Sequence, residues 1–568
     1  GGGGPGDPAA GEAPGDPAGD DARPAAAGPG GDTPAVTVDL DGLAARVVGV
    51  PVAESRYSWL RAVTGGLAWL RSEVTGVLGE GAADPDDDPP RAALERFDLA
   101  KRTCSELVAA LDWFEVSGDG SRLVIRDRGE LRVIPAGAKD SDDGPEPVTV
   151  DLSRARFLAD PQAQRAHAFA EAGRLMRHDF WVADMAEVDW DGVLDSYRPL
   201  LAAIRTSDDF TDLIWEIFGE LGCSHAYVWD APTGGEPASP PVGYLGADLV
   251  QAADGSWQVA RILPGESSDP RARSPLSAPG AAVAPGATLL AVDGQPVDAA
   301  VGPGPLLVGA ARKPVELTVS EAGRPRRVAV IPLASERRLR YQDWVAANRR
   351  QVHELAAGQA GYLHVPDMMG EGWAHFHRDL RAELARDALI LDVRQNRGGH
   401  VSELVVEKLA RRIMGWDMGR GLRPGTYPRE APRGPVVALT DEFAGSDGDM
   451  ITAAIRILAL GPVVGARTWG GVLGIDDPFR LVDGTQVAVP RYAVWLSTFG
   501  WDVENYGVDP DVEVVISPDD WAAGRDPQLA TAVRLALEAL QARPAVRPPD
   551  SAQRASRKRP PLPPRAGG

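Results

Sequence analysis

Residues 441–450, DEFAGSDGDM, place one serine between small and acidic neighbours. The apolar segment GPVVALT before them is typical of a buried strand, and ITAAIRILAL after them is typical of a helix. Ser446 is therefore expected at a strand's carboxyl end and a helix's amino end, where free backbone N–H groups favour negative charge. Such a serine is either a helix N-cap or a nucleophile, and Ala444 excludes the G-x-S-x-G pattern of a nucleophile elbow.

A nucleophilic serine needs a base, and the chain contains eight histidines. His225 has the most suitable context, because it follows a helix-ending Gly222, opens an apolar segment, and has the hydroxyl of Ser224 beside it. A structural role for His225 stays open on this ground alone. His375 and His377 point to different faces of one expected helix, and H-E-x-x-H is absent, so a metallohydrolase is poorly supported.

A second Gly-rich turn follows another apolar strand in DVRQNRGGH, residues 392–400. The backbone N–H groups of Gly398 and Gly399 can approach a substrate closely, since no side chain intervenes. Two such donors are what an oxyanion requires. A plain turn explains the pattern equally well.

The composition excludes several classes of protein. The chain has 568 residues and a net charge of -22, from 59 basic and 81 acidic residues, which argues against general binding to nucleic acids or anionic membranes. Cys104 and Cys223 are too few for a disulfide framework or a zinc ribbon. We find no signal peptide and no apolar run of transmembrane length, and expect a soluble cytoplasmic protein.

The elements that must position these residues fall into a multidomain α/β plus β fold. Residues 160–181 and 206–221 predict amphipathic helices, and SHAYVWD predicts a strand. The predicted domains are a disordered Gly/Pro/Ala-rich segment (1–34), short strands with the texture of β-propeller blades (35–150), a helical and mixed subdomain with Ser224 and His225 (151–235), a PDZ-like domain (236–340), an α/β domain with Ser446 and Glu504 (341–543), and a disordered basic tail (544–568).

Two details of this division can be checked directly. The strand-rich part predicts short strands separated by turns, most clearly within residues 37–52, and a hairpin over residues 117–135. In the PDZ-like part, GYLG at residues 243–246 resembles the loop that binds a chain-end carboxylate. The PDZ-like domain is therefore expected either to bind chain ends or to be a structural insert.

The order of the segments resembles a known family. LGCSHAYV, the PDZ-like insertion, LDVRQNRGGHVSEL, DEFAGSDGDM and VENYGVDPD follow one another as in the tricorn family of tail-specific, or C-terminal-processing, serine proteases. The resemblance covers residues 40–540 and implies a partial β-propeller, catalytic domains that form an α/β sandwich, and an inserted PDZ-like domain.

The resemblance also implies a role for each candidate residue. Ser446 would be the nucleophile and His225 its general base, with Ser224 orienting the imidazole and Glu504 holding Ser224. The remaining implied residues are the oxyanion donors Gly399 and Asp447, with Gly398 as the fallback, and Asp417, an acidic residue that favours basic side chains before the scissile bond.

The implied function is hydrolysis of oligopeptides through an acyl-enzyme, downstream of larger proteases, by a hexamer that uses no cofactor and no metal. It requires folding to bring His225 within hydrogen-bond reach of Ser446, about 220 positions further along the chain. The alternative is a non-catalytic scaffold whose PDZ and propeller modules bind peptides.

Overall fold

The structure is a computed structural model that describes residues 39–73, 91–137, 147–156, 158–231, 240–266, 272–554 and 556–559. It divides into two compact units, residues 1–156 and 157–568, and each is described by itself below. The predicted disordered segment 1–34 lies outside the described residues, as do the last nine residues of the predicted tail.

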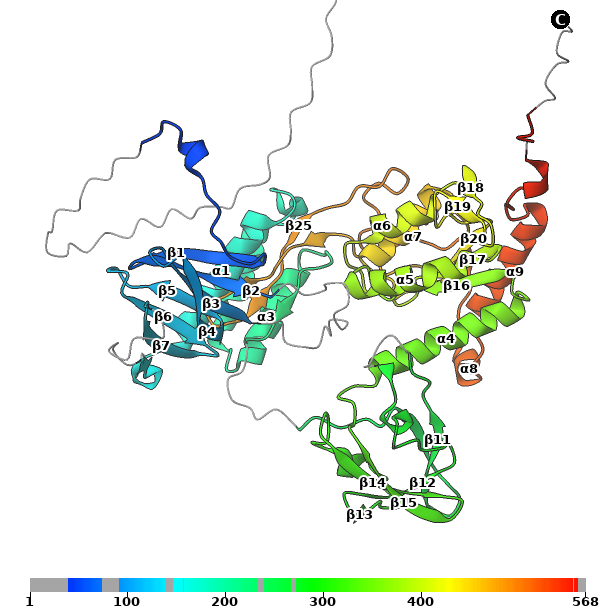
Figure 1. The fold of residues 1–568 in the computed structure, drawn as a ribbon, viewed down its shortest axis with the longest axis horizontal. Helices are drawn as coiled ribbons and strands as arrows, with labels where there is room; N and C mark the ends of the chain where they lie inside the picture. The colour runs from blue at the N-terminus through cyan, green and yellow to red at the C-terminus, as the bar shows by residue number, and fades with distance from the viewer. Residues whose placement is uncertain are drawn as a thin grey trace, which may run out of the picture. The chain divides into compact units, whose positions relative to one another are not determined.

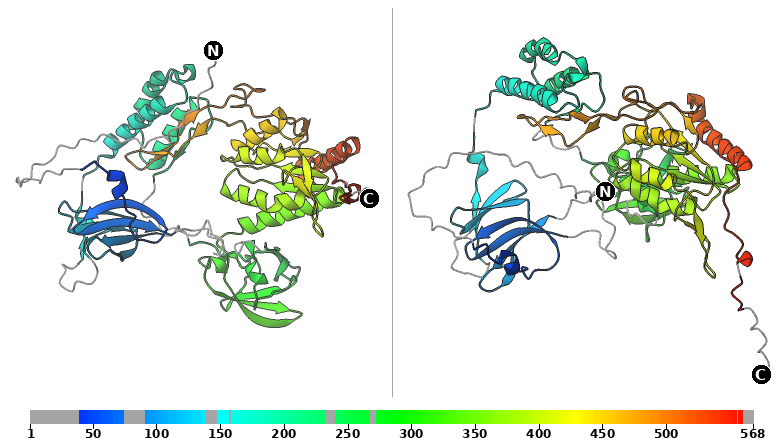
Figure 2. Two further views of the ribbon diagram at one scale, coloured as in Figure 1. Left: turned by 45° about the horizontal axis from the view of Figure 1, so that its top comes forward. Right: turned by 90° about the horizontal axis from the view of Figure 1, so that it is seen from above.

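The first unit consists of two four-stranded antiparallel sheets, each with its strands in chain order (Figure 2, blue and light blue). The first sheet contains β1 (Arg56–Val63), β2 (Gly66–Ser72), β3 (Ala92–Asp98) and β4 (Thr103–Leu111). The second contains β5 (Trp113–Val116), β6 (Arg122–Asp127), β7 (Glu130–Pro135) and β8 (Val148–Val150). Four-stranded meanders are the building blocks of propellers, and the assignment to a propeller stays a prediction.

Of the two predictions for the first unit, the structure confirms one and contradicts the other. The hairpin is confirmed, because β6 pairs with β7 in register from Arg122↔Pro135 to Asp127↔Glu130. The prediction of short strands within residues 37–52 is wrong: the described part of this range contains a short 3-10 helix, Leu43–Arg46, and no strand. Gly42 adopts a positive φ of 69°, which interrupts an extended backbone, and Val47 and Val48 are exposed. This apolar segment therefore pairs with no strand among the described residues.

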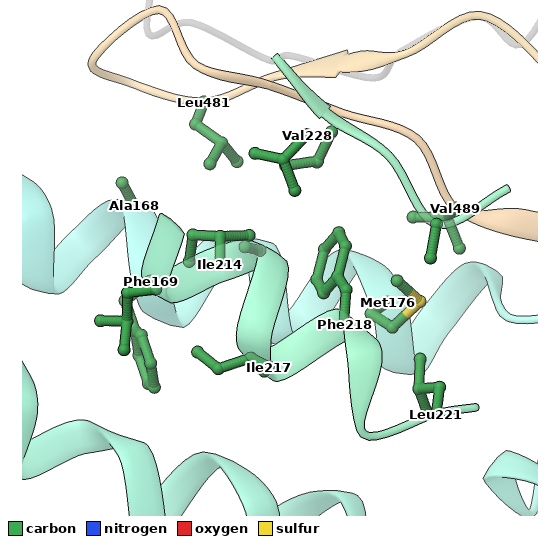
Figure 3. Packing of buried hydrophobic residues seen from close by; sticks show 14 of the residues in the cluster. Ala168, Phe169, Met176, Ile214, Ile217, Phe218, Leu221, Val228, Leu481 and Val489 are labelled. Carbon is green, nitrogen blue, oxygen red and sulfur yellow. The ribbon is translucent and has the colours of Figure 1, made fainter. Parts of the chain in front are cut away.

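The second unit begins with a helical subdomain. Its elements are α1 (Pro161–Asp179), α2 (Trp190–Tyr197), α3 (Ser207–Gly219) and β9 (Val228–Trp229). Asp160 caps α1 and Thr206 forms a capping box at α3, as expected from the start signals in the sequence. Figure 3 shows the core between the helices, where Phe169, Met176, Ile214 and Phe218 interdigitate.

A distant segment completes this subdomain. β23 (Phe479–Arg480), β24 (Gln486–Val487) and β9 form one antiparallel sheet, in which Val487 pairs with Val228. Leu481 and Val489 from the same segment lie over the helices in the core shown in Figure 3. β9, the strand that follows His225, is thus held by a distant segment. The two are separated in sequence by more than half the length of the second unit.

The inserted domain is a separate sheet with its own core (Figure 1, green). Its strands are β10 (Ala247–Gln251), β11 (Trp257–Ile262), β12 (Thr288–Val292), β13 (Gln295–Pro296), β14 (Val315–Glu321) and β15 (Arg324–Val330). The order is β10-β11-β12-β14-β15, with β13 paired to β12. β10 is one of the two edge strands of this path and directly follows the GYLG segment.

The α/β domain is built on a five-stranded parallel sheet in the order β16-β17-β20-β21-β26. Its strands are β16 (Ala360–His364), β17 (Ala388–Asp392), β20 (Val436–Thr440), β21 (Val463–Gly465) and β26 (Val512–Glu513). The residues of β16, β17 and β20 are all buried, as their continuous apolar runs predict for strands covered on both faces.

Two layers of helices cover this sheet (Figure 1). α4 (Arg337–Leu355) and α9 (Pro527–Ala542) share one core with it, and α5 (Gly370–Glu383), α6 (Ser402–Leu409) and α7 (Asp447–Ile457) share the other. The smaller elements are β18 (Gly415–Asp417), β19 (Gly425–Tyr427), β22 (Gly474–Ile475), β25 (Pro490–Tyr492) and α8 (Pro518–Ala522). None of the helices in the described ranges is both long and apolar enough to cross a membrane.

The start of the predicted tail is attached to the α/β domain. The backbone N–H of Val546 donates to the Arg433 carbonyl oxygen at 2.8 Å, and Arg547 pairs with Asp387. Ala545 is buried. The ordered domain therefore extends to residue 547, beyond the predicted boundary at 543.

Candidate active site

Ser446 occupies a strained turn between β20 and α7. Its φ of 56° and ψ of -119° are unusual for a residue with a side chain, and strain of this kind is commonly found at functional sites. The residue is the N-cap of α7, yet its side chain makes no capping hydrogen bond. The hydroxyl is half-buried and remains available for other chemistry.

The Gly-rich turn after β17 packs directly against Ser446. A Cβ built on Gly398 would lie 2.6 Å from the Ser446 Cβ, so no side chain fits there. Gly399 has a φ of 142°, and a Cβ on it would lie 2.1 Å from the Met368 carbonyl oxygen. The two glycines therefore allow this backbone to lie close to the serine.

The backbone donors around the serine are not equivalent. The Gly398 N–H already donates to the Asn396 side-chain oxygen at 2.9 Å, and Asn396 is fully buried. Neither the Gly399 N–H nor the Asp447 N–H has a hydrogen-bond partner among the described residues. Gly399 and Asp447 therefore have free donors, whereas Gly398, the fallback, does not.

The Asp447 side chain has a structural contact away from the serine. It accepts a hydrogen bond from the Ser402 N–H at 3.1 Å, which ties the start of α7 to the start of α6. Burial raises the pKa of this carboxyl above its ordinary value. Its backbone, and not its side chain, borders the serine.

His225 lies on the turn between α3 and β9. Gly222, with a φ of 55°, ends the helical segment, and His225 itself has a positive φ of 60°. The His225 side chain is buried, and its Nδ1 lies 2.8 Å from the Ser224 Oγ. Because Nδ1 is occupied in this way, Nε2 is the nitrogen left to act on another group.

Glu504 holds Ser224 from a segment 280 positions away. One carboxylate oxygen accepts the Ser224 N–H at 2.6 Å, and the other accepts the Ser224 hydroxyl at 3.0 Å. The second oxygen also accepts the N–H groups of Val472 and Leu473, at 2.8 and 3.1 Å. The structure thus brings Ser224, His225 and Glu504 into the contacts that the resemblance implies, while their roles stay predictions.

Burial and charge act on His225 in opposite directions. Burial lowers the pKa of the imidazole below its ordinary value, and the negative charge of Glu504 partly opposes this. Burial has the larger effect, so the imidazole is neutral near pH 7. A neutral imidazole is the form that can accept a proton.

The serine and the histidine border the same indole ring. The ring centroids of His225 and Trp469 lie 5.5 Å apart, and a Cβ built on Gly445, next to Ser446, would lie 2.6 Å from the Trp469 ring. No hydrogen bond joins His225 to Ser446 within the part of the chain that the structure describes. Hydrogen bonds between a nucleophile and its base are often long without substrate and shorten when it binds.

Asp417 is not brought to this cluster. It lies exposed on β18, in the hairpin with β19, and makes no ion pair with the described residues. The structure of one chain therefore leaves its predicted role in specificity untested.

Three further residues at the site escaped the sequence analysis. Asp449 accepts hydrogen bonds from the turn after β21, Asn396 holds the Gly-rich turn, and the Trp469 ring lies against both His225 and Gly445. The position of Asp449, three residues after an N-cap serine, is typical of a capping box and was a usable signal. Nothing in the sequence marks Asn396 or Trp469, because their roles depend on contacts between distant segments.

The described residues contain no group of three or more His, Cys, Asp or Glu side chains able to hold a metal. Cys104 is exposed and Cys223 half-buried, and neither forms a disulfide.

The fold and the site define a class of protein. Residues 359–514 match the model of peptidase family S41, and this range contains the parallel sheet, Ser446 and Glu504. Residues 161–219 match the tricorn protease C1 domain, and residues 243–335 match the tricorn protease PDZ domain. The chain belongs to the tricorn protease family within S41.

Individual relatives agree with this assignment. Tricorn protease homolog 1 of Streptomyces coelicolor is 56% identical over 520 residues, which cover 91% of this chain and 48% of the relative. Tricorn protease of Thermoplasma acidophilum is 34% identical over 82% of this chain and 43% of its own length. A crystal structure of the tricorn protease superposes with a TM-score of 0.76 at 31% identity, covering 85% of this chain and 46% of that one. The chain spans about half the length of these relatives.

Proposed function

We propose that this chain is the catalytic part of a serine peptidase that hydrolyses oligopeptides through an acyl-enzyme. The observation that carries the proposal is the Ser224 hydroxyl, which lies 2.8 Å from the His225 Nδ1 and 3.0 Å from the Glu504 carboxylate. A histidine oriented through a second hydroxyl and a carboxylate is a general base in a defined tautomer. A serine without a cap hydrogen bond, beside two free N–H groups, is a suitable nucleophile.

In the first half of the reaction, the Ser446 Oγ attacks the carbonyl carbon of the peptide bond while His225 Nε2 takes the hydroxyl proton. The negative charge that develops on the carbonyl oxygen is stabilised by the N–H groups of Gly399 and Asp447. The carbon–nitrogen bond then breaks, and the imidazolium gives its proton to the leaving amine.

In the second half, a water molecule attacks the ester, and His225 takes one of its protons. Collapse of this intermediate breaks the bond to the Ser446 Oγ, and the proton returns from His225 to the serine. Peptide and enzyme are then separate, and neither a metal nor a nucleotide takes part.

Membership of the tricorn family supports a proposal for substrate class and assembly. We infer that the substrates are oligopeptides released by larger cytoplasmic proteases, and that a hexamer performs the reaction. Asp417 would then act from a neighbouring subunit on a basic side chain before the scissile bond. Its exposure on the β18–β19 hairpin agrees with a role outside its own chain.

The scaffold alternative needs an open carboxylate loop in the PDZ domain. The Gly246 N–H in this loop instead donates to the Glu336 carboxylate at 2.8 Å, and Glu336 is buried. Arg340 pairs with Glu336 at 2.7 Å and also with Asp248 on β10 at 2.8 Å. A carboxylate of the chain itself thus occupies one backbone donor of this loop, which favours the peptidase over the scaffold.

The test is covalent labelling with a fluorophosphonate, which reacts with activated serines. Wild-type chain is expected to be labelled and to cleave peptides containing Arg, Leu and Asp, whereas Ser446→Ala is expected to do neither. Ser207→Ala is the matched control, because this serine is exposed at the start of α3 and its hydroxyl donates to Asp208, outside the site. Normal cleavage by Ser446→Ala would overturn the proposal.

A binding experiment separates the two functions. Fluorescence anisotropy with a peptide that ends in a free carboxylate should detect no binding to the wild-type PDZ domain and a gain of binding in Glu336→Ala. An amidated copy of the peptide is the control. Tight binding to an unlabelled, inactive wild type would favour the scaffold.

A further inference from the structure

Asp449 is a fully buried carboxylate beside the candidate nucleophile that the mechanism above does not use. It is the third residue of α7, and it accepts hydrogen bonds from the Gly470 N–H at 2.9 Å and the Gly471 N–H at 3.2 Å. The backbone N–H of Ser446 and the hydroxyl of Thr468 lower the pKa of this carboxyl, which opposes the effect of burial. Through Asp449, the start of α7, directly after Ser446, is thus joined to the turn that contains Gly470 and Gly471.

The next two residues of the same turn belong to the other half of the site. The N–H groups of Val472 and Leu473 donate to Glu504, which also holds Ser224. Four consecutive N–H groups, from Gly470 to Leu473, are therefore divided between two carboxylates. Asp449 lies on the side of the nucleophile, and Glu504 lies on the side of the histidine.

This segment, residues 470–473, has little freedom to move. Gly470 has a φ of 89°, and a Cβ on it would lie 2.5 Å from the Gly507 backbone nitrogen. The Gly470 carbonyl oxygen accepts the Asn505 N–H at 2.7 Å, next to Glu504. A shift of the segment at one carboxylate would therefore be transmitted to the other.

The donors to Asp449 are all uncharged. Burial raises the pKa of this carboxyl to about 6, and the hydrogen bonds from Thr468, Gly470, Gly471 and Ser446 oppose that rise. An asparagine would keep the shape but turn an NH2 group toward N–H groups, where it finds no acceptor. The four donors therefore require a carboxylate as their acceptor, and a side chain that only filled the space would leave them without one.

We propose that Asp449 is a positioning residue that, through residues 470–473, holds the nucleophile in register with the Ser224–His225–Glu504 relay. The inference rests on the proposed peptidase function and adds a residue to it. The Asp449 carboxylate binds backbone N–H groups of residues 470 and 471 and makes no hydrogen bond to the Ser446 hydroxyl or to His225 among the described residues, so it acts through the start of α7 and the shared segment.

The experiment compares Asp449→Asn, Thr468→Val and Thr468→Ser with wild type in the whole chain. The rate of fluorophosphonate labelling and kcat on a peptide substrate should fall about 10- to 100-fold in Asp449→Asn, with KM near its wild-type value, because misplacement of reacting groups by about 1 Å costs this much. Thr468→Val should show a smaller loss in the same direction, and Thr468→Ser, which keeps the hydroxyl, should label at the wild-type rate.

Glu383→Gln is the matched control for burial. Glu383 is buried in the same α/β domain and accepts hydrogen bonds from Tyr362 and His353, away from the site. A wild-type labelling rate in Asp449→Asn would overturn the inference. The inference would also be overturned if the labelling rates of Asp449→Asn and Glu383→Gln fell only in proportion to the decrease in melting temperature of each variant.

Two further outcomes are decisive. If Asp449→Asn does not fold, equal labelling rates in Thr468→Val and Thr468→Ser would overturn the inference, and a slower Thr468→Val would support it. If wild type itself is not labelled, the peptidase function fails, whereas failure of the positioning role alone leaves the wild type labelled.

Discussion

The two halves of the candidate site are built in different ways. The nucleophile half, residues 396–399 and 441–450, lies at the ends of two neighbouring buried strands, β17 and β20, of one parallel sheet. The relay half joins Ser224 and His225, which follow a helix, to Glu504, which lies on a loop 280 positions further along the chain.

The difference concerns what holds each half in place. Strand ends in a parallel sheet meet because the sheet forms, so the nucleophile half follows from burial of β17 and β20. The relay half depends on one carboxylate that receives four hydrogen bonds from Ser224, Val472 and Leu473. It is the half in which a single substitution should disturb geometry without unfolding the domain.

The largest expected effect tests whether the two halves act together in one catalytic step. Ser446→Ala and His225→Ala should each lower kcat about 10⁴-fold or more, and the double variant should be no slower than either, because residues that act as a unit are not additive. Steady-state kinetics on one peptide measures all three.

His178→Ala is the control for loss of a histidine, since its side chain is 79% exposed. It should keep wild-type activity. A double variant whose kcat is below the wild-type value by the product of the two single losses would mean that the halves work independently.

The next effect sharpens the role of the carboxylate. Glu504→Gln should lower kcat about 100-fold or more, because an orienting carboxylate is lost from the relay. The Ser446 half should stay folded, so the melting temperature should fall much less than the activity. Glu513→Gln, an exposed glutamate on β26, is the matched control and should be unchanged. Wild-type kcat in Glu504→Gln would remove Glu504 from the relay.

A smaller effect concerns pH. Burial lowers the pKa of His225 below its ordinary value of 6.5, so the base stays neutral to a lower pH, and the acid limb of kcat/KM should lie below pH 6.5. Because the charge of Glu504 raises this pKa, the residual activity of Glu504→Gln should have its acid limb at still lower pH. An acid limb that moves upward in this variant would contradict the assigned contact.

The smallest effect lies outside both halves. Asp417→Asn should reduce the ratio of kcat/KM for a peptide with Arg before the scissile bond to that for one with Leu, about 10-fold or less, since an exposed carboxylate pairs weakly with a cation. Activity on the Leu peptide should be unchanged. An unaltered ratio would exclude Asp417 from the specificity pocket.

Sequence reasoning succeeded where structure is local and failed where it is not. The helices of the C1 part, the hairpin at β6 and β7, and the buried strands β17 and β20 follow from periodicity, caps and turn residues. The prediction of short strands within residues 37–52 failed because an apolar run forms a strand only where a neighbouring strand pairs with it. The extent of the chain past residue 543 was missed because it depends on contacts with Arg433 and Asp387.

The sequence by itself determined the order of the domains and the types of residue available for chemistry: a serine between a strand and a helix, a histidine next to a serine, and a glutamate in VENYGVDPD. Tertiary structure alone decided that Glu504 reaches Ser224, that Gly398 is already engaged while Gly399 is free, and that Asp449 and Glu504 share residues 470–473. The physical reason is that hydrogen bonds form between atoms about 3 Å apart, whatever their separation along the chain.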